Sequence, residues 1–178
     1  AGPSSAEALL VAQVELPGQQ TGERCLRQRT AADLYDTYEN MVLTEGHFGF
    51  KAVVLHDPAK KGVLCYGDCK LEEGVQALLL HCRSAEKSSI TVFIDDRKAA
   101  FWEGDTVSYE RMPMPPLDEK AREDAKRRKA GWQPVYTDVR LPLDEDLIGE
   151  AVKAGKAVEI RLELTGDISL CSLQAEYK

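Results

Sequence analysis

The sequence predicts an α+β fold made mainly of an antiparallel β-sheet or sandwich, with two or three peripheral helices. Residues 106–111 and 157–164 alternate apolar and polar side chains without a break. Residues 89–94 form a run rich in β-branched and aromatic side chains, and this run ends at an Asp-Asp pair. A period of two, bounded by Gly, Asp and Ser, is typical of antiparallel strands with one buried face.

A chain of 178 residues can form one domain with a sizeable core, and we expect residues 1–178 to do so. The expected parts are an N-terminal extension over 1–24, a helix and loop over 25–48, and a β-rich core over 50–178. The net charge of −7 argues against a nucleic-acid partner, because that affinity depends on clustered Lys and Arg. No apolar run reaches the roughly 18 to 20 residues that a membrane span needs, so none is expected.

The first helix is predicted over residues 30–46. Thr30 stands where an N-cap is expected, and Asp33 supplies an acidic first turn. Apolar residues then follow at helical spacing, namely Leu34, Tyr38, Met41 and Val42. Gly46 follows the pattern, so a helix packed against the sheet is expected here.

Strand or helix is an open choice for residues 71–83. The apolar residues match helical spacing, whereas Gly74 and the unbroken run over 77–80 suit a buried strand. We favour a turn followed by a strand from 75 to 83. A helix would instead create a βαβ unit over 50–94, and with it an α/β three-layer fold.

Two further helices are expected beyond the meander. Residues 117–130 are strongly charged, with acidic residues at the start and basic residues at the end, as the helix dipole favours. Between Asp144 and Gly155, the apolar residues again fall at helical spacing, and these are Leu147, Ile148, Ala151 and Val152.

Five cysteines suggest an oxidising compartment, where four would pair and one would remain. The candidates are Cys65, Cys69, Cys82 and Cys171. A turn at Gly67 and Asp68 would bring Cys65 and Cys69 within disulfide distance, and Cys82 with Cys171 would form a long-range bond. The alternative is that some of these cysteines are small buried residues with free thiols.

Four residues are candidates for a binding surface: His47, Phe48, Phe50 and Trp132. The first three lie between or beside glycines and could form an exposed recognition loop. The alternative is that their aromatic rings insert into the core. No catalytic, phosphate-binding or metal-binding motif is present, so we expect no cofactor and no metal.

The alternative class is a thiol- or metal-dependent enzyme. Its nucleophile or metal ligands would come from Cys65 or Cys69 together with the nearby His81. Zinc ranks lower, because His81 and Cys82 are adjacent on a strand and point to opposite faces.

A resemblance covers residues 76–174. It rests on the pattern formed by the run Leu79, His81, Cys82 and Arg83, a strand over 91–94, the run 107–111, Trp132, and a helix over 143–152 before a last hairpin. This pattern resembles small secreted β-sandwich proteins of the bacterial envelope, of the invasion-associated locus B type and the type VI secretion accessory type. The resemblance implies a secreted or periplasmic protein that is not an enzyme.

The expected function is therefore a non-catalytic, secreted or periplasmic binding or accessory module. Its expected partner is another protein or an envelope component. A cytosolic adaptor is a third class, and it would require all five thiols to be reduced.

Overall fold

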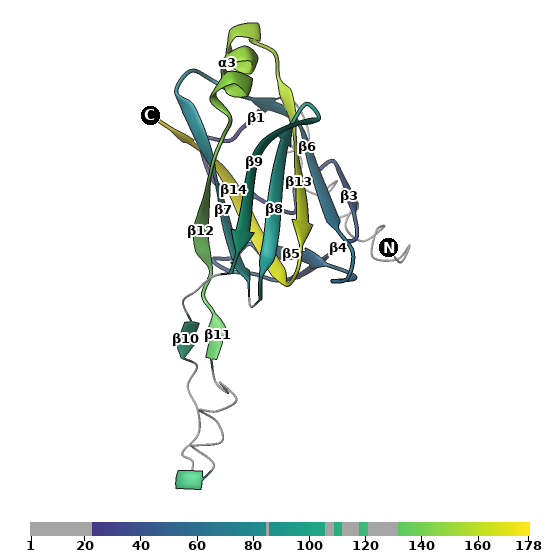
Figure 1. Ribbon diagram of the computed structural model, residues 1–178, viewed down its shortest axis with the longest axis vertical. Coiled ribbons are helices and arrows are strands. Elements are labelled where there is room, and N and C mark those ends of the chain that lie inside the picture. Colours follow the sequence, from purple (N-terminus) through teal and green to yellow (C-terminus); the bar gives the residue numbers. More distant parts are fainter. Residues whose placement is uncertain (1–22, 85, 106–108, 112–117, 121–131) are drawn as a thin grey trace.

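The computed structural model describes residues 23–84, 86–105, 109–111, 118–120 and 132–178. Two β-sheets pack face to face in a sandwich (Figure 1). Sheet A contains β1 (Arg24–Cys25), β6 (Gly62–Lys70), β13 (Val158–Thr165), β8 (Ser88–Ile94) and β9 (Arg97–Gly104) in this order, and β3 (Thr37–Glu39) also pairs with β6. Sheet B contains β12 (Thr137–Pro142), β7 (Val75–Ser84), β14 (Ile168–Tyr177), β5 (Lys51–Leu55) and β4 (Met41–Glu45), with β2 (Thr30–Ala31) beside β14.

The pairing within the sheets is antiparallel except for the short parallel pair β1–β6. This confirms the prediction of a mainly antiparallel sandwich. A further hairpin, β10 (Tyr109–Arg111) with β11 (Trp132–Pro134), projects from one end of the sandwich (Figure 1). The single-domain prediction concerns the whole chain, and residues 1–22 lie outside the described part.

Alternation of side chains explains why the strands of sheet A form. In β13 every second residue from Val158 to Leu164 is buried, whereas the residues between them face outward. In β8 the residues Ile90, Val92 and Ile94 are buried in the same way. Because strand side chains point alternately to the two faces, each strand turns one apolar row toward sheet B.

The choice for residues 71–83 is decided by β7, which runs from Val75 to Ser84 and pairs antiparallel with both β12 and β14. The predicted strand is thus confirmed, and the alternative βαβ unit is wrong. Leu78, Leu80 and Cys82 point into the core, and Ala77 and His81 on the opposite face are buried as well. Burial on both faces explains the nearly unbroken apolar run.

The helix predicted over residues 30–46 is wrong, because β2, β3 and β4 occupy this segment. Asn40 has a φ of 58° and lies where the chain passes from sheet A to sheet B. Its amide Nδ2 donates to the carbonyl of Asp57 at 2.9 Å, and its Oδ1 accepts from the Asp57 N–H at 2.8 Å. Pairing with β6 and β5 therefore outweighs a helical spacing that arose by coincidence.

The helix predicted between Asp144 and Gly155 is confirmed as α3 (Glu145–Ala154). The carboxylate of Asp144 accepts the Leu147 N–H at 3.0 Å and caps the first turn. Gly155 adopts a φ of 65° and donates its N–H to the carbonyls of Ala151 and Val152. Among the described residues, α3 is the one helix whose whole length can be followed, whereas two or three helices were expected. The helix predicted over 117–130 lies almost wholly outside the described residues.

The core lies between the two sheets. Its largest fully buried side chains include Leu64, Leu78, Leu80, Ile160 and Leu162. In the described part of the chain, no helix has the length and the apolar character needed to cross a membrane.

Candidate functional site

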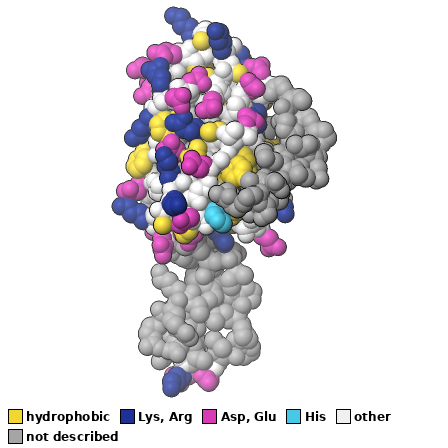
Figure 2. Space-filling view, turned by 90° about the vertical axis from the view of Figure 1, so that its right-hand side faces the viewer, with side chains coloured by type: hydrophobic (Ala, Val, Ile, Leu, Met, Phe, Trp, Pro, Cys, Tyr) yellow, Lys and Arg dark blue, Asp and Glu magenta, His cyan; other side chains and the backbone are white. Residues whose placement is uncertain are grey.

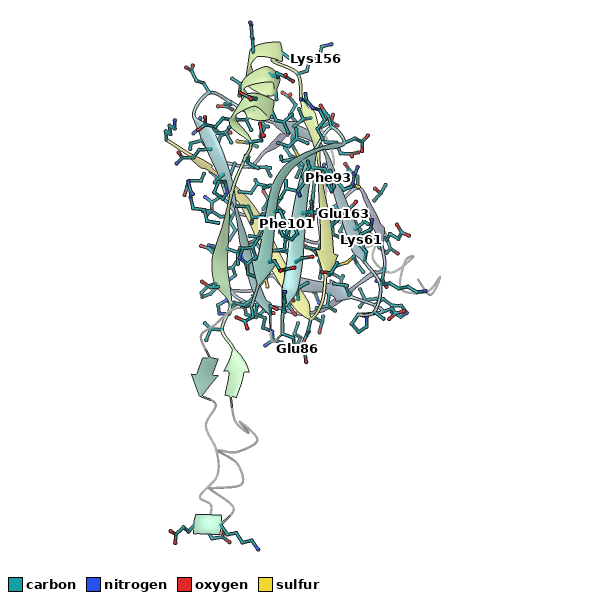
Figure 3. The ribbon with its side chains drawn as sticks, in the orientation of Figure 1. Lys61, Glu86, Phe93, Phe101, Lys156 and Glu163 are labelled. Carbon is teal, nitrogen blue, oxygen red and sulfur yellow. The ribbon has the colours of Figure 1, made fainter. Side chains whose placement is uncertain are left out.

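The outer face of sheet A carries two aromatic rings among polar side chains. Phe93 on β8 and Phe101 on β9 both point away from the core, because they occupy the outward positions of their strands. Thr91 lies directly across from Phe101, and Arg161 on β13 lies across from Phe93. We call this surface, formed by Phe93, Phe101, Arg161, Glu163 and Thr91, the aromatic face (Figure 3).

Cations lie against both rings of the aromatic face. The guanidinium carbon of Arg161 is 4.3 Å from the centre of the Phe93 ring, and Lys98 Nζ is 5.1 Å from the centre of the Phe101 ring. Phe101 is 52% exposed, whereas Phe93 is half-buried beneath Arg161. Each ring of the aromatic face thus makes a cation–π contact, and Phe101 remains half exposed beside its cation.

Ion pairs fix the polar part of the aromatic face. Arg161 donates to the carboxylate of Asp96 and to Glu163 Oε2, the latter at 3.3 Å. Lys61 Nζ lies 3.2 Å from the other oxygen of Glu163. The hydrogen bond that Arg161 donates to Asp96 is the main cause that raises the pKa of Arg161. Cationic and anionic side chains are also interspersed over the side of the molecule in Figure 2.

A second cluster lies on the outer side of sheet B. His81 on β7 places its Nδ1 2.9 Å from Asp138 Oδ1 on β12, and its Nε2 2.8 Å from Nδ1 of His47. The rings of His47 and Tyr136 are stacked, with centres 4.9 Å apart and an angle of 10°. Phe48 follows His47 with a φ of 53° and is 71% exposed. We call His47, His81, Tyr136 and Asp138 the histidine cluster.

A cleft of about 560 Å³ lies between α3 and the edge of sheet B. Ile148 and Gly149 line it from the helix, and Gln76 and Arg140 line it from the strands. Glu176 accepts hydrogen bonds from Gln76 Nε2 at 2.8 Å and from Arg140 Nη2 at 2.7 Å, and the bond from Arg140 is the main cause that lowers its pKa. The strand side of the cleft is thus held in a fixed arrangement.

The predicted bond between Cys65 and Cys69 is not formed, and all five cysteines are free thiols in the structure. The turn expected at Gly67 and Asp68 is a bulge inside β6, which pairs with β13 on both sides of it. Residues four apart in an extended strand are separated by about 13 Å, far beyond the roughly 6.8 Å limit for a disulfide.

Cys82 and Cys171 lie on the neighbouring strands β7 and β14, but they belong to opposite faces of sheet B. Cys82 points into the core, whereas Cys171 lies at a bulge beside Tyr136 and the backbone N–H of His47. Burial raises the pKa of Cys82 and of Cys69 to about 12, and it also raises the pKa of Cys171. These thiols stay protonated at neutral pH and are therefore poor nucleophiles.

The enzyme alternative required His81 near Cys65 or Cys69, and the structure does not bring them together. His81 lies on sheet B, whereas both cysteines lie on sheet A. Within the described ranges, no group of three or more His, Cys, Asp or Glu side chains is placed to hold a metal ion.

Of the predicted binding residues, the structure brings His47 and Phe48 together with His81. Phe50 is half-buried and donates its N–H to the His47 carbonyl at 3.0 Å, which closes the turn around Phe48. The backbone of Trp132 belongs to β11, and its side chain is outside the description.

The candidates named from the sequence did not include Phe93 and Phe101 of the aromatic face. The signal was present, because the alternation over residues 89–94 already places Phe93 on the face opposite to Ile90 and Val92. Tyr136 and Asp138 gave no comparable signal, since their proximity to His81 depends on the pairing of β12 with β7.

A scan of protein-family models found no match to this sequence, and a search of curated proteins found none either. Solved structures do show the same fold. An arabinoxylan arabinofuranohydrolase of glycoside hydrolase family 43 from Bacillus subtilis, solved with cellotetraose, matches with a TM-score of 0.60 and 9% identity. The match covers 89% of this chain and only 28% of the hydrolase chain.

Two family 6 carbohydrate-binding modules match over nearly their full lengths. The module from Clostridium stercorarium, solved with cellobiose, has a TM-score of 0.57 and 10% identity, over 88% of this chain and 98% of that chain. The module from Clostridium cellulolyticum, solved with xylose, has a TM-score of 0.57 and 13% identity, over 86% and 99%. At these identities the likeness concerns the fold alone: the chain has the β-sandwich fold that these carbohydrate-binding modules share.

Proposed function

We propose that this chain is a non-catalytic carbohydrate-binding module, and that it binds a glycan on the aromatic face of sheet A. The observation that carries the proposal is the pair Phe93 and Phe101 on the outer face of sheet A beside Arg161 and Glu163, where the Phe101 ring is exposed. The fold shared with modules solved with cellobiose and xylose supports a carbohydrate partner.

The chemistry of the aromatic face suits a sugar ring. An aromatic ring offers an apolar surface to the C–H groups of a sugar, while fixed polar groups accept and donate hydrogen bonds to its hydroxyls. Arg161 is held by Asp96 and Glu163, so little side-chain freedom would be lost when a glycan binds. Thr91, which lies across from Phe101 and two residues before Phe93 on β8, adds a hydroxyl to the same face.

A glycan polymer is an extracellular or envelope component, so a secreted or periplasmic location belongs to this proposal. The resemblance to secreted envelope proteins stays a prediction, and it shares with the proposal a non-enzymatic β-sandwich. Disulfides were expected as a sign of an oxidising compartment, but the five cysteines are free thiols in the structure. They therefore do not support this location.

Isothermal titration calorimetry with cello-, xylo- and β-1,3-gluco-oligosaccharides tests the proposal. We expect at least one series to bind, and we expect Phe101→Ala and Phe93→Ala each to weaken binding about tenfold or more, as for aromatic residues at the centre of an interface. Phe48→Ala is the matched control, because Phe48 is also an exposed phenylalanine but lies beside sheet B. Loss of binding in the control alone, or no binding to any glycan, would refute the proposal.

A further inference from the structure

The histidine cluster links the connection between β4 and β5 to sheet B through one chain of hydrogen bonds. Asp138 accepts from Nδ1 of His81, since a carboxylate has no proton to donate near neutral pH. Nε2 of neutral His81 is then an acceptor, so Nδ1 of His47 is the donor of the 2.8 Å bond. The turn that follows is closed by the bond between Phe50 and His47.

This chain of bonds can take up one proton but not two. One added proton can reside on Nε2 of His81, whose Nδ1 faces Asp138, and His81 then donates the same bond to Nδ1 of His47. With a second proton on the pair, two N–H donors would face each other across 2.8 Å, and the bond cannot exist.

The other charged and titratable groups around the pair do not relieve this conflict. Arg29 lies 3.7 Å from Asp138 Oδ2, and Arg83 lies over the Tyr136 ring at 5.1 Å. Both cations oppose further positive charge. Cys171 and Tyr136 also lie beside the pair, and burial is the main cause that raises the pKa of each.

We propose that the His47–His81 pair is a pH-sensitive latch, which holds residues 46–50 over Cys171 at neutral pH and releases them in acid. Cys171 is fully buried, and it contacts the backbone N–H of His47 and the side chain of Tyr136. Release of the latch uncovers this thiol and frees Phe48 from its left-handed backbone conformation.

The direction of the pH effect follows from the proton count. The open form can bind one proton more than the latched form, because two protonated imidazoles cannot share the bond between His47 and His81. The fraction of open molecules should therefore rise as the pH falls, by up to about tenfold for each pH unit.

Labelling of Cys171 with a pyridyl disulfide reagent, mapped by peptide mass spectrometry between about pH 7.5 and 5, tests the latch. Rates are normalised to a small free thiol at each pH. We expect labelling of Cys171 to accelerate in acid while labelling of the core thiol Cys82 stays slow. Equal acceleration at Cys82 would indicate global unfolding and would overturn the proposal.

Three variants separate the latch from a merely structural role. His47→Gln can both donate to and accept from His81, so its labelling should be slow and independent of pH. His47→Ala should be labelled quickly throughout. His56→Gln, which changes an exposed histidine, should behave as the wild type. A flat wild-type profile, or a pH response retained in His47→Gln, refutes the latch.

Discussion

Replacing Gly149 by alanine should stabilise the protein, whereas the same replacement at Gly155 in the same helix should destabilise it. Gly149 lies inside α3 and is exposed, and a Cβ added there meets no atom within 4 Å. Gly155 ends the helix with a φ of 65°, and a Cβ added there also meets no atom within 4 Å. Sterics are therefore equal, and only the backbone conformation differs.

The expected magnitudes follow from that difference. Glycine in an exposed helix interior is about 0.5 to 1 kcal/mol less favourable than alanine, so Gly149→Ala should gain that amount. A non-glycine residue in the left-handed region costs about 1 to 2 kcal/mol, partly offset by lower entropy of the unfolded chain. Gly155→Ala should therefore lose roughly 1 kcal/mol, and the two variants should differ by about 2 kcal/mol.

Urea unfolding followed by circular dichroism measures both effects. At about 2 to 4 °C per kcal/mol for a chain of this size, thermal unfolding should separate the two variants by several degrees. Equal slopes against urea would show that the surface exposed on unfolding has not changed. Stabilisation by Gly155→Ala would refute the assigned end of α3, since it would mean that Gly155 is not held at positive φ. Destabilisation by Gly149→Ala would refute the assignment of Gly149 to an exposed helix interior.

Two other predictions concern ionisable groups. The carboxylate of Asp36 accepts two hydrogen bonds from Arg24, at 2.9 and 2.7 Å, and this pairing is the main cause that lowers its pKa. The contribution of the Arg24–Asp36 pair to stability should thus be complete above the ordinary carboxyl pKa and disappear as pH falls below about 4. The urea midpoints of the wild type and Asp36→Asn should therefore converge in acid. A gap between the two midpoints that stays constant with pH would contradict this. The other prediction concerns alkylation of the native protein at about pH 8, which should label the exposed Cys25 and spare Cys69. Burial raises the pKa of Cys69 to about 12, so its thiol stays protonated at that pH. Equal labelling of both thiols would place Cys69 outside the core.

Local patterns were sufficient for elements whose side chains already divide into a buried and an exposed row. β13 and α3 belong to this group, because a period of two or of 3.6 is imposed by the backbone of each single element. The same alternation placed Phe93 on the outer side of its strand. It could not show that Arg161, 68 positions later in the chain, would stand across from it.

The failures have a common physical cause, which is competition with distant partners. Residues 30–46 carry a helical spacing, yet β6 and β5 supply strand pairing that a local pattern cannot contain. Gly67 and Asp68 are turn residues by propensity, but continued pairing with β13 makes them a bulge and keeps Cys65 away from Cys69.

The sequence by itself determined the mainly antiparallel class, most strand positions and the capped helix, since these depend on neighbours within a few residues. The tertiary structure alone decided which side chains share a surface. His47, His81 and Asp138 are 34 and 57 residues apart along the chain, and they meet only because β7 pairs with β12 and the β4–β5 connection lies beside them. Sites of this kind depend on strand register, and register is set by the packing of the whole sandwich rather than by any single segment.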